Sequence, residues 1–197
     1  MAGSEGGRRH TREDVARAAL RILDDDGLPD LTMRRLAADL DVQPSALYWH
    51  FPNKQALLAE LADRIVAAAP RRRGGHASHA EAEAAALRDA LLAYRDGAEV
   101  VLSTLALGLG ATLARDRLAE AVVADGYDTN VAQRVAGALL HFVIGHVSYE
   151  QQRMQYDSIG LVAPATDLRD EASSVDFAFG VNLLLGGLAA GAAPAGV

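Results

Sequence analysis

Apolar residues recur at the spacing of an α-helix along most of this chain, and no stretch of useful length shows the apolar and polar alternation of a β-strand. In the first such segment, which ends at Gly27, Val15, Ala19, Ile22 and Leu23 fall on one helical face. A chain with this pattern buries its apolar faces by packing helix against helix. We therefore predict an all-α protein.

Capping residues, glycines and prolines mark where the helices begin and end. Thr11 followed by Asp14 resembles a capping box, and Gly27 is a helix stop. Thr32 is a good N-cap, and Pro44 suits a first helical turn. These signals predict a helix over residues 12–25, short helices over 32–40 and 43–51, and further helices over 54–69, 80–94, 98–107, 111–124, 131–156 and 172–190.

The segment PRRRGGHASH, residues 70–79, is the best linker candidate because it is rich in proline, glycine and arginine. We expect a first domain over residues 10–66, whose last helix continues as a connector to residue 69, and a larger domain over residues 77–190. Residues 1–9 and 191–197 are expected to be flexible tails. Arg8 and Arg9 either form an arm that enters the minor groove of DNA or belong to a solvated tail.

Charge is divided unevenly between these parts. The formal net charge of -7 and the pI of about 5.3 are unfavourable for a nucleic-acid binder. Residues 1–73, however, contain 12 lysines and arginines against 11 acidic residues, whereas residues 74–197 contain 7 against 15. Because the excess acid lies in the second part, the first part can still assemble a basic face.

Composition argues against several other classes of protein. There is no cysteine, so a disulfide, a thiolate metal site and a cysteine nucleophile are impossible. The chain starts without the apolar run of a signal peptide, and no stretch offers about 18 uninterrupted apolar residues for a membrane span. No glycine-rich phosphate loop and no paired carboxylates beside a base recommend an enzyme. We expect a cytoplasmic protein without a membrane partner.

Residues 32–54 have the proportions of a helix-turn-helix, but a helical hairpin inside a bundle core would look similar. The residue types favour DNA binding, because one short segment combines amide, hydroxyl, aromatic, imidazole and ammonium groups suited to base edges and phosphates. These side chains are Gln43, Ser45, Tyr48, Trp49, His50 and Lys54. Leu47 and Phe51 are expected in the core instead.

The segment LTMRRLAADLDVQPSALYWHFPNKQALL resembles the DNA-binding signature of the TetR family of bacterial repressors, and the resemblance covers about residues 10–66. It implies that Thr32 and Arg34 approach double-stranded DNA. Arg34 is suited to reading a guanine, since its fork matches the O6 and N7 acceptors. The resemblance also implies that seven residues lie in or beside the major groove: Gln43, Pro44, Ser45, Tyr48, Trp49, His50 and Lys54.

Past the linker, the stretches LLAYRDGAEVVLSTLA, GALLHFVIGHVSYEQQ and FAFGVNLLLGGL resemble the tetracycline-repressor branch of that family. The resemblance implies a ligand cavity in each subunit and a homodimer formed by the last long helices. One of these helices carries His141 and His146, which lie on different faces and are not expected to share a metal. The final helix would contribute Phe179, Val181, Leu184, Leu185 and Leu188.

The chain departs from tetracycline repressors at the positions that hold the drug and its magnesium ion. Val101 stands in place of a metal-binding histidine, Pro70 in place of a second histidine, and Tyr149 in place of a glutamate. Glu83 and Leu87 replace an asparagine and a phenylalanine of the pocket. We therefore expect no metal and no cofactor, and a hydrophobic or aromatic effector. Its candidate contacts, each of which could instead be plain packing, are Leu61, Leu87, Tyr94, Val101, Thr104, Leu105, Leu118, Val122, Gln133, Ala136, Leu140 and Tyr149.

These observations lead to the hypothesis of a homodimeric repressor that binds a palindromic operator and is released by a small-molecule effector. The effector would tilt the helix over residues 54–69, taken to be the only rigid link between the cavity and the DNA-binding domain. Control of efflux or resistance genes fits the resemblance. Two alternatives stay open: a constitutive DNA-binding regulator without an effector, and a helical enzyme.

Overall fold

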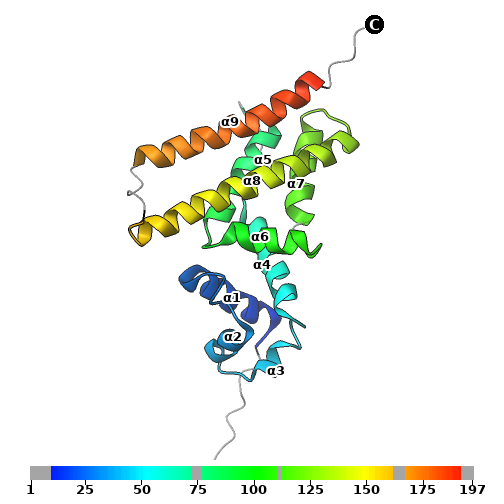
Figure 1. The fold of residues 1–197 in the computed structure, drawn as a ribbon. Coiled ribbons are helices and arrows are strands. Elements are labelled where there is room, and N and C mark those ends of the chain that lie inside the picture. Colours follow the sequence, from blue (N-terminus) through cyan, green and yellow to red (C-terminus); the bar gives the residue numbers. More distant parts are fainter. Residues whose placement is uncertain (1–9, 72–76, 111, 162–166, 192–197) are drawn as a thin grey trace, which may run out of the picture.

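The computed structural model of the chain describes residues 10–71, 77–110, 112–161 and 167–191. Within them it contains nine α-helices and no strand, so the predicted all-α class is confirmed. Figure 1 shows a small head of α1–α3 at one end, a larger body of α5–α9, and α4 between them. The bounds are α1 (Arg12–Asp26), α2 (Met33–Asp39), α3 (Pro44–Leu47), α4 (Lys54–Ala68), α5 (His79–Leu92), α6 (Gly97–Ala106), α7 (Thr112–Ala124), α8 (Thr129–Ser158) and α9 (Asp167–Gly191).

The head forms around α1, whose two ends follow the local signals in the sequence. Thr11 and Asp14 make the predicted capping box, and Gly27, at a φ of 91°, is the C-cap. The apolar face of α1 packs into a core that includes Leu47 and Phe51, which are 1% and 0% exposed as predicted. Burial of Leu47 and Phe51 therefore fixes the segment between α2 and α4, which has little regular secondary structure of its own.

Two predicted helix ends are wrong. Helix α3 ends at Leu47, residues 48–50 form a turn, and Phe51 lies beyond the helix. Phe51 is not helical because Pro52 follows it, and a proline disfavours the helical conformation at the residue before it. Helix α9 begins at Asp167 instead of Ala172, while the other ends match the prediction or differ from it by at most two residues. The predicted arm at Arg8 and Arg9 and the tail after Gly191 lie outside the described residues.

The body is organised by α8, which packs against α5, α6, α7 and α9. Helices α8 and α9 run antiparallel (Figure 1), and they approach closely where Gly180 of α9 faces the Phe142 ring of α8. A Cβ atom at Gly180 would lie 2.2 Å from that ring, so a larger residue there would require the Phe142 ring to move. Phe142 also stacks on Phe177, with 5.7 Å between the ring centroids. This contact fixes the position of α9 on the body.

Helix α4 is anchored in the body by a buried arginine of α7. Arg117 is 4% exposed and donates hydrogen bonds to the backbone carbonyl oxygens of Val66 at 2.9 Å and Ala69 at 3.0 Å. Its Nε lies 2.5 Å from a carboxylate oxygen of Glu83 on α5, which is 7% exposed. Arg117 therefore satisfies carbonyl groups that the end of a helix leaves without partners, and it ties α4 to α5 and α7.

A second link joins body and head at the turn between α5 and α6. Asp96, which is buried and has a φ of 56°, accepts a hydrogen bond from the backbone N–H of Leu28 in the head at 2.8 Å. Its other carboxylate oxygen accepts one from Gln155 of α8 at 2.5 Å. The expectation that α4 is the only rigid link is therefore wrong. The sequence showed no sign of this contact because its partners are 68 positions apart.

Within the described ranges, none of the helices has the length and apolar character to cross a membrane. The same part of the chain contains no group of three histidine or acidic side chains arranged to hold a metal ion.

Candidate functional site

The exposed end of the head consists largely of residues 43–50, which we call the recognition segment. Pro44 starts α3, and Gln43 precedes it without using its side chain as a cap. Gln43, Pro44 and Ser45 are exposed, Tyr48 is 49% exposed and Trp49 is 89% exposed. An indole that is almost fully exposed buries little apolar surface within the chain. Its placement fits a surface that meets another molecule.

Two neighbouring arginines at the start of α2 have different surroundings. Arg35 pairs with Asp26 at 2.5 Å and with Asp30 at 3.4 Å, so it serves the head itself. Arg34 is exposed, and among the described residues no hydrogen bond or ion pair engages its side chain. The Thr32 hydroxyl accepts from the backbone N–H of Arg35 at 3.1 Å, which confirms Thr32 as the N-cap. Arg34 is therefore the arginine available to a ligand.

His50 and Lys54 differ from the other predicted DNA contacts because both are half-buried. The Lys54 ammonium lies 3.5 Å from the backbone carbonyl oxygen of Leu28, between the head and α4. The backbone carbonyl of His50 accepts a hydrogen bond from Arg12. The structure thus brings seven of the nine predicted residues to the surface and leaves these two at its edge.

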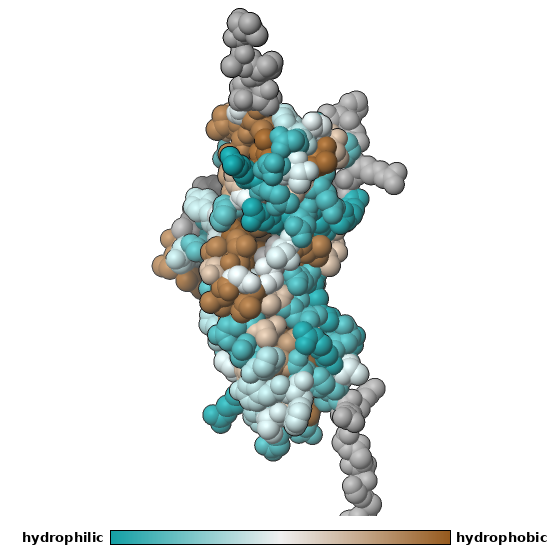
Figure 2. Space-filling view, turned by 90° about the vertical axis from the view of Figure 1, so that its right-hand side faces the viewer, coloured by the Kyte–Doolittle hydropathy of each residue, from teal (hydrophilic) through white to brown (hydrophobic). Residues whose placement is uncertain are grey.

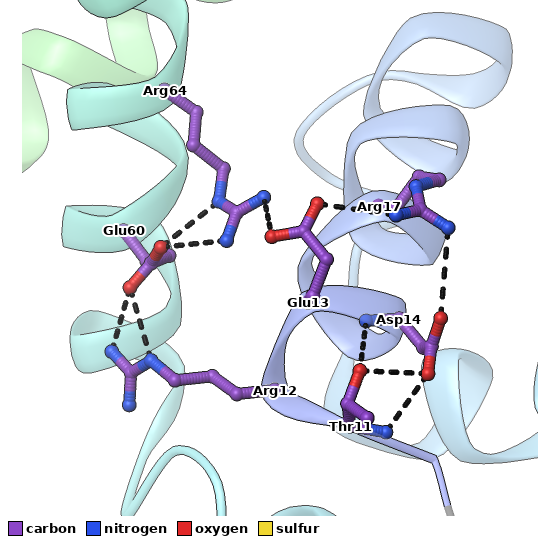
Figure 3. Close-up of polar contacts among 7 residues, drawn as sticks. All are labelled: Thr11, Arg12, Glu13, Asp14, Arg17, Glu60 and Arg64. Carbon is purple, nitrogen blue, oxygen red and sulfur yellow. Dashed lines mark hydrogen bonds and ion pairs between the residues drawn. The ribbon is translucent and has the colours of Figure 1, made fainter.

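A network of charged side chains joins α1 to α4 beside the recognition segment (Figure 3). Glu60 of α4 accepts from Arg12 at 2.7 Å and from Arg64 at 2.9 Å. Arg64 continues to Glu13 of α1 at 2.7 Å. Partial burial raises the pKa of Glu60, but hydrogen bonds from both arginines outweigh it, so its pKa lies below 4.5. The hydrogen bond from Arg64 lowers the pKa of Glu13 in the same way. The network therefore stays charged near neutral pH.

Most of the predicted effector contacts are buried in the hydrophobic core that the body shares with α4. Leu61, Leu87, Val101, Thr104, Leu118, Val122, Ala136 and Leu140 are at most 2% exposed. Tyr94 and Leu105 are half-buried against the same core. Gln133 lies in a surface depression between α7 and α8, and Tyr149 is 60% exposed. Ten of the twelve residues therefore belong to one packed core or lie against it, and Gln133 and Tyr149 lie at the surface.

Two other features of the body bear on where a small molecule could bind. The Glu83–Arg117 ion pair is buried in the body, and Arg117 also donates to the backbone carbonyl of Ala69, next to Pro70. A groove of about 470 Å³ lies between α5, α8 and α9, and Tyr149 is the predicted contact that lines it. Arg88 and Glu150 form an ion pair in this groove, and Ser173 donates to the same carboxylate at 2.5 Å.

Sequence reasoning missed the buried polar residues that connect the elements. Gln151 of α8 donates to the backbone carbonyls of Leu91 and Tyr94 at 3.0 and 2.8 Å, and it accepts from the Ala98 N–H at 3.2 Å. Gln155 lies one turn further along α8 and reaches Asp96. The signal that was available is weak: Gln151 and Gln155 are four residues apart and therefore share one face of the helix, where polar groups need partners if that face is buried.

The fold and this surface together define a class of protein: a helix-turn-helix DNA-binding head carried by a helical body. Two family models match the chain. The model of the bacterial regulatory proteins of the TetR family matches residues 15–61, and the tetracycline-repressor-like C-terminal domain matches residues 70–162. The chain belongs to the TetR family of bacterial regulatory proteins, which are DNA-binding transcription factors and not enzymes.

Similar proteins agree with this assignment. The class C tetracycline repressor of Escherichia coli is 39% identical over 75% of this chain and 68% of its own length. The crystal structure of Mycobacterium smegmatis BioQ is 40% identical, covers 92% of this chain and 98% of its own, and has a TM-score of 0.78. BioQ has also been solved with its natural double-stranded DNA operator, at 38% identity over 92% of this chain and 99% of that one, with a TM-score of 0.75.

A solved structure also shows a drug bound to a relative. A variant of TetR from Acinetobacter baumannii in complex with minocycline is 30% identical, covers 90% of this chain and 96% of its own, and has a TM-score of 0.69. Regulators of this family bind operator DNA and typically act as dimers.

Proposed function

We propose that this protein is a homodimeric repressor that binds a palindromic operator through residues 10–66 and responds to a hydrophobic or aromatic small molecule through residues 77–190. The observation that carries the proposal is the recognition segment, where polar and aromatic side chains are exposed on a head that two links hold to the body. Release of the operator would lower repression of efflux or resistance genes.

Contacts with DNA are assigned by side-chain chemistry and placement. Arg34 has the fork that reads guanine and no partner within the described residues, so we assign it a base contact. Gln43, Ser45, Tyr48 and Trp49 supply further groups for base edges, thymine methyls and phosphates. Thr32 and Pro44 are exposed on the same surface, and His50 and Lys54 lie at its edge, where they would approach the DNA beside the major groove.

A dimer surface is supported by the outer face of α9. Val175, Phe179 and Leu183 follow at intervals of four residues and are 66%, 69% and 65% exposed, so they form one apolar ridge. Such a ridge on a long helix is expected to pack against a second copy of the same helix. Of the other residues assigned to the dimer, Leu184 borders the ridge, whereas Val181 is 2% exposed and belongs to the core of its own chain.

Coupling between effector and operator has a physical route in the two links. Arg117 fastens one end of α4 to α5 and α7, and Asp96 fastens the head to α6 and α8. An effector that separates the packed helices of the body must disturb one or both links. The two recognition segments of the dimer would then no longer match half-sites about 34 Å apart.

One observation favours a second candidate, a regulator that binds DNA without an effector. Eight of the predicted effector contacts are at most 2% exposed, and the Glu83–Arg117 ion pair is buried as well. An effector at this place must open the core first, which reduces its apparent affinity. The two candidates differ in whether any compound raises the melting temperature of the protein and weakens its operator complex.

The first experiment measures operator affinity for Arg34→Ala and Tyr48→Ala beside the wild type, near 0.15 M salt. The probe is a duplex selected from a random-sequence pool on the full-length protein. We expect each variant to bind roughly tenfold or more weakly, since a bidentate base contact contributes about 1–3 kcal/mol. Arg134→Ala, an exposed arginine of α8, is the control and should bind as the wild type does. Equal affinity of all four proteins would contradict the assignment of the surface.

A compound panel then tests the effector. A ligand that binds the folded protein stabilises it by about 2.7 kcal/mol at a hundred times its Kd, which a thermal shift detects. Linkage requires that the operator weakens ligand binding by the factor by which the ligand weakens operator binding. If a ligand bound equally well with and without operator, that ligand would not control operator binding, and the protein would be a constitutive regulator.

A further inference from the structure

Arg12 lies at the start of α1, outside the residues assigned to DNA, yet its side chain reaches the end of the recognition segment. Its Nη1 donates to the backbone carbonyl oxygen of His50 at 2.7 Å. The same guanidinium lies over the Phe51 ring, 4.2 Å from the ring centroid. The two contacts hold a backbone group beside Trp49 and a buried ring in one fixed arrangement with α1.

The recognition segment needs such support because it has little structure of its own. Helix α3 is four residues long and has no side-chain cap at its start. A single helical turn is unstable alone, since nucleation costs more than one hydrogen bond returns. Leu47 is buried, but the next three residues leave the helix and carry mostly exposed side chains. The position of Tyr48 and Trp49 therefore depends on tertiary contacts at His50 and Phe51.

Arg12 can give this support because α4 holds its guanidinium in place. Its Nε and Nη2 donate to one carboxylate oxygen of Glu60 at 3.1 and 2.7 Å. The other oxygen of Glu60 accepts from Arg64, which also pairs with Glu13 (Figure 3). The N–H groups of this one guanidinium thus bond Glu60 of α4 and the His50 carbonyl, while its flat face lies over the Phe51 ring. A lysine has no planar fork and cannot make these contacts together.

We propose that Arg12 is a positioning residue for operator recognition. It fixes the end of the recognition segment against α1 and α4, and it does not hold a DNA phosphate. The proposal rests on the placement of residues 43–50 against DNA, which Tyr48→Ala tests independently of Arg12. The competing role is a direct phosphate contact, because the Arg12 side chain is 54% exposed.

The first test compares Arg12→Lys with the wild-type full chain on two duplexes, the selected operator and a random-sequence duplex of equal length. The charge is the same in both proteins, and electrostatic contact supplies most non-specific binding. We expect operator affinity to fall roughly tenfold, equal to about 1.4 kcal/mol, with affinity for the random duplex unchanged. The control is Arg17→Lys, because Arg17 lies on α1 and in the same network but pairs with Glu13 and Asp14.

Glu60→Gln separates the two roles without changing Arg12. It removes the support from α4 and also a negative charge from the head. If Arg12 held a phosphate, affinity for both duplexes would stay the same or rise. A positioning role requires the operator affinity to fall while the random duplex binds as before or more tightly.

A readout without DNA is provided by Trp49, the single tryptophan of the chain. Time-resolved fluorescence anisotropy of Trp49 should show greater local motion in Arg12→Lys and Glu60→Gln than in the wild type and Arg17→Lys. The comparison is made where circular dichroism shows all four proteins folded. The proposal is overturned if Trp49 motion is unchanged, or if Arg12→Gln weakens both duplexes alike and lowers the salt slope by about 0.9.

Discussion

At the scale of single residues, the polar side chains of this protein act mainly by holding backbone groups. Asp125, at the end of α7, accepts from the backbone N–H groups of His79 and Ala80 at 2.8 and 2.9 Å and from the His79 ring at 2.9 Å. Burial raises the pKa of Asp125, but these hydrogen bonds outweigh it, and the pKa lies below 3.8. The ionised carboxylate of Asp125 therefore holds the start of α5 in place.

The depressed pKa of Asp125 predicts how its contribution depends on pH. The folded protein releases this proton more readily than the unfolded chain, so the stabilisation is complete above about pH 4 and is lost as pH falls through the folded pKa. Asp125→Asn should lower the free energy of unfolding by about 1–3 kcal/mol at pH 7. Urea denaturation from pH 3 to 7 measures both effects.

The pH dependence separates this role from a loss of packing. The difference between wild type and Asp125→Asn should shrink as pH drops below 4, whereas Asp116→Asn, at an exposed position of α7, should match the wild type throughout. A difference that is constant down to pH 3 would show that the carboxylate charge is not what fastens α5.

At the scale of helices, local signals predicted most of what the structure contains, and tertiary contacts account for the rest. Thr11, Gly27 and Thr32 act on their own neighbours, so a cap or a stop can be read from a few residues. The chemistry of the recognition segment was equally local, which is why its exposed residues could be named from their types. The end of α3 was missed because Phe51 is fixed by the core and by Pro52.

Contacts between distant helices could not be predicted because nothing in the local pattern specifies the partner. Gln151 and Gln155 stand among other polar residues at the end of α8, and their partners lie 53 to 60 positions away. Nothing in the sequence indicated that Arg117 is buried or that it pairs with Glu83, although the two residues are 4% and 7% exposed in the structure. The packed body, and with it the difficulty of admitting an effector, follows from such contacts.

The link through Asp96 can be tested at this scale with Asp96→Asn. Asparagine tolerates the φ of 56°. It offers one acceptor, however, where both the Leu28 N–H and the Gln155 amide need one. We expect faster amide exchange over residues 27–31 and a weaker operator complex, since the head loses one of its contacts with the turn between α5 and α6, where Arg95 also bonds Asp24 and Asp25. Hydrogen exchange by mass spectrometry measures the first effect.

Asp25→Asn is the matched control for this link, because Asp25 is an exposed acid at the end of α1. Its exchange and operator affinity should equal those of the wild type. If Asp96→Asn exchanged at the wild-type rate over residues 27–31, the Asp96 contact would not be needed to place the head.

At the scale of the whole molecule, exposed apolar side chains gather in two separate regions of the body, one near α6 and one on α9. Figure 2 shows apolar side chains at the level of α6, above a largely hydrophilic head, and Leu102, Leu107 and Leu109 are 43%, 58% and 42% exposed in this region. Helix α9, which carries the ridge, lies at the far end of the body from the head (Figure 1). A dimer through α9 therefore leaves both heads free to reach one DNA duplex.

Phe179→Glu tests whether operator binding requires that dimer. A charge in the middle of the ridge must be desolvated for two copies to pack, so we expect a monomer in sedimentation experiments at micromolar concentration. Each monomer keeps an intact recognition segment but loses the gain from linked binding, so operator affinity should fall by roughly a hundredfold or more. Leu107→Glu adds the same charge at a similarly exposed leucine after α6, and it should stay dimeric and bind normally. If Leu107→Glu instead gave the monomer and Phe179→Glu did not, the α6 surface would be the dimer contact, and the two heads would have to be spaced differently on DNA.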